Sequence, residues 1–130
     1  QQIPQVLDFL KQSSRPVILA GSGIRHAKAT KEFLDLVERL GIPVLTSRRG
    51  ADLVPDDHHY FFGRPGTYGQ RSANFVIQNC DLLISIGSRL SIPLVGRNTK
   101  AFARAARKIV VDIDPNELEK PTFININFIL

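Results

Sequence analysis

The 130-residue chain has no methionine, no tryptophan and a single cysteine, Cys80. One cysteine excludes an internal disulfide and any metal site built from several thiolates. No apolar run approaches the ~20 residues that a membrane-spanning helix needs. The start, Gln1-Gln2-Ile3-Pro4, offers neither the basic residues nor the apolar core of a secretory signal. We therefore expect a cytoplasmic protein with no membrane partner and, because an initiator methionine is missing, a piece of a longer polypeptide.

The positive charge is spread along the chain. The net charge is +5, but Lys and Arg lie scattered through predicted helices, with small groups at Arg48-Arg49 and at 104–108. A nucleic-acid surface would need clustered charge together with exposed aromatic residues. We expect no nucleic-acid partner, and we expect residues 1–130 to form one domain in which residues 1–14 are a linker helix.

Short apolar segments, each followed by small or polar residues, dominate the rest of the chain. The clearest is Pro16–Ala20, which runs without alternation into Gly21-Ser22-Gly23, as in a strand buried on both faces of a parallel sheet. Further strands are predicted at 42–46, 60–62, 81–86 and 108–112, and a last strand or frayed end at 122–130. Helices are predicted before residue 13 and over 27–40, 71–79 and 99–107.

Strands that alternate with helices predict an α/β fold with a parallel sheet and right-handed crossovers. In such sheets ligands bind at the carboxyl ends of the strands. This rule gathers the loops that follow the strands into one place, together with the glycine-rich loop at 63–69. The loops are 21–23, 47–49, 87–89 and 112–114.

These loops suit an anionic ligand, although none carries a complete motif. The fingerprint Gly-x-Gly-x-x-Gly would need glycine where this chain has His26. Arg48 stands near the place where an NAD site would carry an acid, so it favours a phosphate. Arg89 would bind a phosphate with two hydrogen bonds or pair with a nearby Asp. Asp114 would accept hydrogen bonds from a ligand or cap the turn at Pro115.

Two other groups have simpler interpretations. His58-His59 beside Asp56-Asp57 are neighbours in a predicted loop and are not expected to converge on a metal ion. Cys80 continues an apolar helix face and is expected to pack in the core. The chain has no Gly-x-Ser-x-Gly elbow and no P-loop, so no catalytic residue is predicted.

Taken in order, five stretches resemble the central domain of thiamine-diphosphate-dependent enzymes of the acetolactate synthase (acetohydroxyacid synthase) type. The resemblance covers about residues 1–121. The stretches are Arg-Pro-Val-Ile-Leu-Ala-Gly-Ser-Gly at 15–23, Gly-Ile-Pro-Val at 41–44, Gly-x-x-Gly with Ser-Ala-Asn at 63–74, Asp-Leu-Leu-Ile-Ser-Ile-Gly-Ser-Arg-Leu at 81–90 and Val-Asp-Ile-Asp-Pro at 111–115.

The resemblance implies a three-layer Rossmann-like fold of the DHS-like NAD/FAD-binding type, with about six parallel strands. It implies that the parent enzyme, a transferase or lyase, holds thiamine diphosphate and magnesium in two flanking thiamine-binding domains and is a homodimer or homotetramer. The family's Gly-Asp-Gly…Asn-Asn segment and its catalytic glutamate are absent here. This domain alone is therefore expected to be non-catalytic.

In the synthase branch of this family the central domain binds FAD. The chain departs from that branch at Ser91-Ile92-Pro93, where flavin-binding synthases carry acidic residues and an arginine. The alternatives are a stand-alone NADP-like binding module and a structural spacer with an empty cleft.

If the cleft is used, Gly87→Val is expected to abolish nucleotide binding with little change in fold. The matching cofactor positions are Gly21, Ser22, Gly23, Ser47, Arg48, Gly66, Thr67, Gly87, Ser88, Arg89, Asp112 and Ile113.

Overall fold

The computed structural model describes residues 2–120 and 126–129. The strands are β1 (Pro16–Ala20), β2 (Val44–Thr46), β3 (Leu82–Ile86), β4 (Arg107–Val111) and β5 (Ile126–Ile129). The helices are α1 (Gln2–Gln12), α2 (Gly23–His26), α3 (Thr30–Leu40), α4 (Arg71–Asn79), α5 (Ile92–Val95) and α6 (Pro115–Glu119), with 3₁₀ turns at Arg48–Gly50 and Thr99–Ala101.

The strands form one sheet in the order β2-β1-β3-β4-β5, and every pairing in it is parallel. After β2 the chain crosses back to the free side of β1, so the direction of winding reverses between β1 and β3. That position is where doubly wound sheets leave room for a ligand beyond the strand ends. The predicted α/β class and parallel sheet are confirmed.

The sheet has five strands among the described residues, and the expected sixth is reduced to one bridge. Phe61, from the predicted strand 60–62, makes an isolated parallel bridge to Val44 at the outer edge of β2. Three backbone hydrogen bonds join this segment to β2: the Val44 N–H donates to the Tyr60 carbonyl at 2.8 Å, the Phe62 N–H to the Val44 carbonyl at 3.0 Å, and the Thr46 N–H to the Gly63 carbonyl at 3.1 Å. β2 begins at Val44, two residues later than predicted, because Pro43 has no N–H to donate to the sheet.

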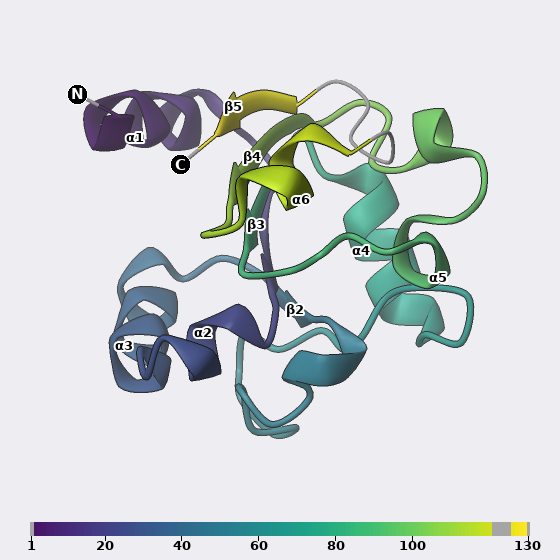
Figure 1. The fold of residues 1–130 in the computed structure, drawn as a ribbon. Coiled ribbons are helices and arrows are strands. Elements are labelled where there is room, and N and C mark those ends of the chain that lie inside the picture. The colour runs from purple at the N-terminus through teal and green to yellow at the C-terminus, as the bar shows by residue number, and fades with distance from the viewer. Residues whose placement is uncertain (1, 121–125, 130) are drawn as a thin grey trace.

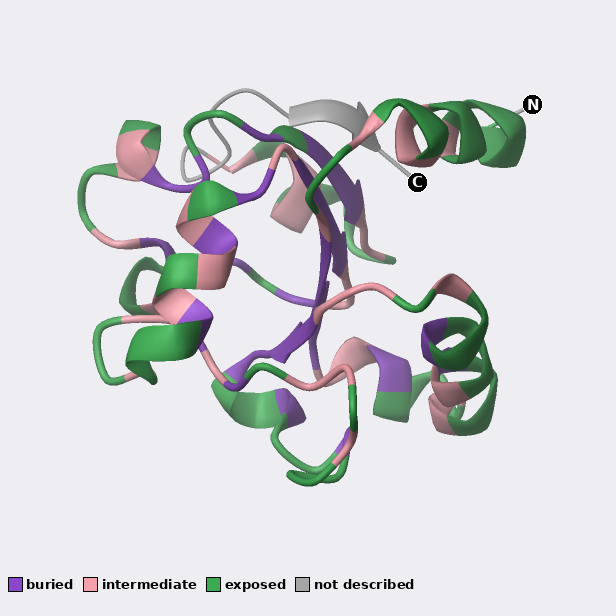
Figure 2. Cartoon of the chain, turned by 180° about the vertical axis from the view of Figure 1, so that it is seen from behind, coloured by how far each residue is buried: buried purple, intermediate pink, exposed green. Residues whose placement is uncertain are grey.

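Helices cover both faces of the sheet, which gives the predicted three layers (Figure 1). One face packs on α4, α5 and the segment after the second 3₁₀ turn, and its core includes Ile77, Leu83 and Val110. The other face packs on α2 and α3, with Phe33 and Val37 in its core. Figure 2 shows buried residues running along the central strands, whereas α1 has no buried residue.

The predicted helix 27–40 is present as α3, which begins three residues later than predicted, at Thr30. The short helix α2 ends at His26, before the predicted range, and Lys28, with a φ of 58° in the left-handed region, turns the chain between α2 and α3. In α3, Phe33 and Val37 are one turn apart and face the sheet. The helix ends at Gly41, which adopts a φ of 59° and donates its N–H to the carbonyl of Val37, as expected for a C-terminal glycine.

The predicted helix 99–107 is wrong. The segment forms one 3₁₀ turn and then folds back, with Ala103 at a φ of 43°. Lys108 Nζ donates to the carbonyls of Ala103 and Ala106 at 3.0 and 3.2 Å, and the Ala103 N–H donates to Gln78 Oε1 at 3.0 Å. These tertiary contacts replace the hydrogen bonds of an alanine-rich helix, whose propensity is only a weak preference.

The secondary structure predicted for both ends of the chain is present where the ends are described. The helix predicted before residue 13 is present as α1, and β5 lies within the predicted last strand 122–130. Residues 121–125 and 130 of that prediction lie outside the described residues. In the part of the chain that is described, no helix has the length and apolar character to cross a bilayer.

Candidate functional site

The loops that follow β1 and β3 touch each other backbone to backbone. A Cβ on Gly21 would lie 2.1 Å from the carbonyl oxygen of Gly87, and one on Gly23 would lie 2.7 Å from the Gly87 Cα. The Gly23 N–H donates to that same carbonyl at 3.0 Å, and Gly87 itself has a φ of 60°. These glycines are therefore required by packing at the winding reversal. Gly87→Val is expected to disturb the fold, which corrects the expectation that it would act on binding alone.

The loop after β2 is tied to the end of β1. Ser47 is buried, and its N–H donates to the carbonyl of Ala20 at 2.8 Å. Arg48 follows on the 3₁₀ turn and is exposed. Arg49, beside it on the turn, is also exposed, and its carbonyl accepts from Arg25 of α2 at 3.3 Å. Arg25 also forms an ion pair with Asp52, so one of the three arginines at this strand end is already paired.

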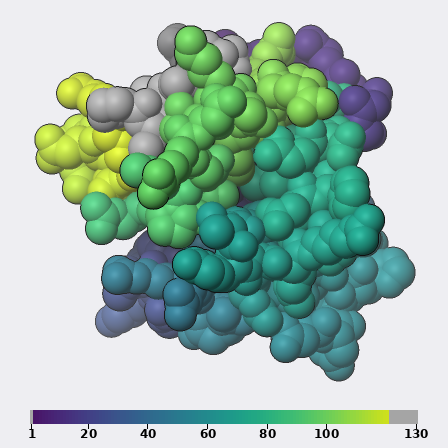
Figure 3. Space-filling model, turned by 90° about the vertical axis from the view of Figure 1, so that its right-hand side faces the viewer, coloured from purple at the N-terminus to yellow at the C-terminus, as the bar shows by residue number. Residues whose placement is uncertain are grey.

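The glycine-rich loop 63–69 joins this edge, as predicted. The side-chain amide of Asn74 holds Gly66 from both sides, because its oxygen accepts from the Gly66 N–H at 2.8 Å and its nitrogen donates to the Gly66 carbonyl at 3.1 Å. Thr67 donates its N–H to the carbonyl of Pro93 at 2.8 Å. Figure 3 shows this face, on which the loop and α4 (teal) lie against the segment that contains α5 (green).

Arg89 has a carboxylate partner. Its Nε donates to Oε1 of Glu117 at 2.7 Å, and Lys120 binds the other carboxylate oxygen and also the carbonyl of Arg89. The Arg89 side chain is 72% exposed and that of Glu117 only 12%. The hydrogen bond from Lys120, with a further one from Arg89, lowers the pKa of Glu117 below its usual value in spite of some desolvation. Glu117 is therefore ionised at neutral pH and shared by two cations.

The loop after β4 is organised by its own carboxylates. Asp112 Oδ1 accepts the N–H of Asp114 at 3.0 Å, and Asp114 in turn caps α6 by accepting the N–H of Asn116 at 2.9 Å. Of the two roles predicted for Asp114, the structure therefore shows the cap of the turn at Pro115. Ile113 between them is 99% exposed, an unusual position for a large apolar side chain beside polar loops.

Several backbone donors at this edge are unused. Among the hydrogen bonds of the described residues, none is donated by the N–H groups of Ser22, Ser88 or Arg89. Ser88 is only 4% exposed. The hydroxyl of Thr46, buried at the end of β2, also has no partner there. Neighbouring unused N–H groups are what an anion-binding loop provides.

No group of three or more His, Cys, Asp or Glu side chains that suits a metal ion occurs in the described part of the chain. His58 instead contacts Glu38, with 2.9 Å between Nε2 and Oε1, and Asp56 pairs with Arg64. Cys80 is buried and donates to the carbonyl of Ile77, and burial raises the pKa of its thiol to about 11. Its predicted role in core packing is confirmed.

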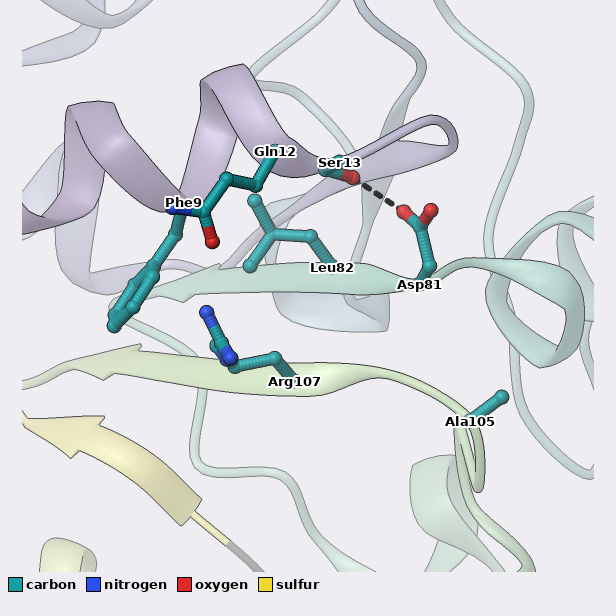
Figure 4. Close-up of a pocket in the computed structure, with 7 residues that line it drawn as sticks. All are labelled: Phe9, Gln12, Ser13, Asp81, Leu82, Ala105 and Arg107. Atoms are coloured by element: carbon teal, nitrogen blue, oxygen red, sulfur yellow. Dashed lines mark hydrogen bonds between the residues drawn. The ribbon is translucent and has the colours of Figure 1, made fainter.

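At the opposite edge, where the strands begin, a hollow of about 260 Å³ lies beneath α1 (Figure 4). Arg107 stacks on the ring of Phe9, with 4.3 Å from Cζ to the ring centroid. Asp81 accepts from the hydroxyl of Ser13 and, at 2.8 Å each, from the N–H groups of Ser14 and Arg15. These contacts fasten α1 to the sheet, and both oxygens of Asp81 are used in doing so.

All twelve predicted site residues therefore lie at the carboxyl edge, and the glycine loops after β1 and β3 are in direct contact. Their contact with a ligand stays a prediction. Sequence reasoning missed Glu117 and Lys120, because 116–120 was interpreted only as a turn of helix. The sequence did contain a signal for this pair: Glu117 and Lys120 are three residues apart, which places both side chains on one side of a short helix.

Comparison with known proteins identifies the family of the chain. Residues 3–129 match the family model described as "Thiamine pyrophosphate enzyme, central domain". Over 119 residues, or 92% of this chain and 20% of the relative, the chain is 40% identical to the "Probable acetolactate synthase large subunit" of Methanocaldococcus jannaschii. It is 37% identical over 97% of its length to the protein of that name from Methanococcus aeolicus, covering 21% of it.

A more distant relative is the "Acetolactate synthase isozyme 2 large subunit" of Escherichia coli, 31% identical over 92% of this chain and 22% of that protein. The chain thus spans about a fifth of the length of the curated relatives that it matches. Because the family model covers nearly every residue, the chain belongs to the family of central domains of thiamine pyrophosphate enzymes.

Proposed function

We propose that this chain is the non-catalytic central domain of an acetolactate-synthase-like carboligase or decarboxylase, and that its carboxyl edge binds FAD or another ADP-containing nucleotide. The parent enzyme would be a cytoplasmic homodimer or homotetramer. The observation that supports the nucleotide is the set of unused N–H groups of Ser22, Ser88 and Arg89, which lie where the winding of the sheet reverses.

The residues present fit a diphosphate better than they fit thiamine chemistry. Backbone N–H groups and arginine side chains are the usual donors to phosphate oxygens. The exposed side chain of Ile113 offers an apolar surface beside them for a flat ring. Magnesium and thiamine diphosphate are assigned to other domains of the parent, since the described residues supply no carboxylate cluster for a metal.

A test uses isothermal titration of the purified chain with FAD, ADP and NADP, after circular dichroism has shown that the chain is folded. We expect FAD and ADP to bind and NADP to bind no better than ADP. A preference for NADP would favour the stand-alone module that Arg48-Arg49 suggested. Absence of heat with all three ligands would favour the structural spacer.

The variant Arg89→Gln sharpens the test. It removes a donor at the proposed phosphate position and is expected to weaken ADP binding about tenfold, as for loss of a charge-assisted hydrogen bond. Lys31→Gln on α3 is the matched control, because it removes the same charge from a helix surface where Lys31 pairs only with Asp35. Equal weakening by both variants would mean that net charge, and not this position, controls binding.

A further inference from the structure

We infer that Glu117 is a specificity-determining residue of the carboxyl-edge cleft: it occupies Arg89 in the free protein, so that only a ligand bearing phosphate displaces it. The inference rests on the proposed function and adds to it the class of group that the cleft accepts. Its basis is the arrangement of one carboxylate between two cations, Arg89 from the loop after β3 and Lys120 from the end of α6.

The first step is a matter of charge. If a ligand carboxylate replaced Glu117 at Arg89, one singly charged group would take the place of another. The exchange would then bring no net gain in binding free energy. The diphosphate of an ADP-containing nucleotide carries at least two negative charges where a carboxylate carries one, and it offers more acceptor oxygens. It would also reach the unused N–H groups of Ser88 and Arg89, which Glu117 does not contact among the described hydrogen bonds. A phosphate therefore replaces Glu117 at Arg89, whereas an uncharged nucleoside does not.

The second step concerns the Glu117 carboxylate after Arg89 has moved to the ligand. The Glu117 side chain is largely buried, with 12% exposed, and a carboxylate left without a cation in such a place would be costly. Lys120 already binds its second oxygen, so Glu117 keeps a cation after Arg89 has moved. Arg89 is free to move, because its side chain is 72% exposed. Lys120 thus lowers the cost of the exchange without contacting the ligand.

This arrangement predicts that substitutions of Glu117 and Lys120 change the affinity for ADP in opposite directions. Glu117→Gln releases Arg89 and is expected to tighten ADP binding about two- to fivefold, the scale of a partly exposed ion pair, with adenosine binding unchanged. Lys120→Gln leaves Glu117 dependent on Arg89 and is expected to weaken ADP binding by a similar factor. Asp35→Asn and Lys31→Gln make the same two charge changes in the exposed pair on α3 and are expected to have no effect.

The experiment is titration of the folded wild-type chain and these variants with ADP and with adenosine, together with Arg89→Gln alone and combined with Glu117→Gln. In the Arg89→Gln background, Glu117→Gln should no longer tighten ADP binding. If wild type binds ADP but Glu117→Gln changes nothing, or Asp35→Asn tightens binding as much, the exchange is overturned and the proposed function stands. If neither the wild type nor any variant binds ADP or FAD, both are overturned.

Discussion

The two edges of the sheet are held together in different ways. At the carboxyl edge the loops after β1 and β3 meet through glycine backbone, with room for no side chain between them. At the amino edge side chains make the connection, with Asp81 collecting three donors and Arg107 stacking on Phe9. A backbone contact leaves no atoms that can move aside, whereas side-chain contacts can be weakened one at a time. The edges should therefore differ in how much a single substitution costs.

The largest effect is expected from Gly21→Ala. The added methyl group would lie 2.1 Å from the Gly87 carbonyl oxygen and 2.5 Å from the Ser88 Cα, both backbone atoms. We expect the free energy of unfolding to fall by ~3 kcal/mol or more. The measurement is urea denaturation. Gly96→Ala is the comparison: nothing lies within 4 Å of its Cβ, so its cost is confined to the strain of a φ of 85°, ~1–3 kcal/mol.

A similar decrease in the free energy of unfolding in both glycine variants would mean that backbone conformation is what makes substitution costly at the carboxyl edge. The contact between the two loops would then not be the cause.

A smaller effect is expected at the amino edge from Asp81→Asn. Burial alone would raise the pKa of Asp81, but the hydrogen bonds from Ser13, Ser14 and Arg15 hold it below the usual value. Removing the charge from these bonds should cost ~2 kcal/mol of unfolding free energy at pH 7. Because a lowered pKa stabilises the fold above the ordinary value and the gain is lost as pH falls through the folded value, the difference between wild type and variant should shrink below about pH 4.

Asp35→Asn serves as the control for Asp81→Asn, since its exposed pair with Lys31 should contribute less than ~0.5 kcal/mol. A difference between wild type and Asp81→Asn that stays constant from pH 7 to pH 2 would show that the carboxylate charge does not contribute.

The smallest effect is expected from Arg107→Ala, which removes the stack on Phe9. A cation above an aromatic ring at such a site contributes ~0.5–1 kcal/mol. The loss should be local and appear as faster hydrogen exchange of the α1 amides. Arg71→Ala is a suitable comparison, because Arg71 stacks on Phe75 within α4, at 5.4 Å, and ties no separate element to the sheet. Unchanged exchange in α1 would contradict a role of Arg107 in holding that helix.

The predictions made from the sequence succeeded where a local sequence pattern is compatible with only one kind of structure. The unbroken apolar run of Pro16–Ala20 gave a central strand, and the parallel order then brought the loops after the strands to one edge. Gly41 ended its helix as expected. The family resemblance is confirmed by the match over residues 3–129.

The predictions failed where side-chain contacts formed in the fold decide the local structure. The alanine-rich segment 99–107 has helical propensity, but its carbonyls bind the buried amine of neighbouring Lys108, and the Ala103 N–H binds distant Gln78. The sixth strand is reduced to the bridge between Phe61 and Val44, a pairing too short to count as a strand. The alternative partner predicted for Arg89 was a nearby Asp, whereas the partner is Glu117 on α6, because no sequence pattern connects the two positions.

The order of the strands also bears on how the protein is made. A ribosome releases the chain from its N-terminus, so β1 emerges early and finds β2 soon afterwards. Its other neighbour, β3, ends at Ile86, and until that residue has emerged one side of an apolar strand has unpaired backbone groups. Such a bare edge invites pairing with other nascent chains. Synthesis of this domain is therefore most vulnerable to aggregation between the emergence of β2 and the emergence of β3.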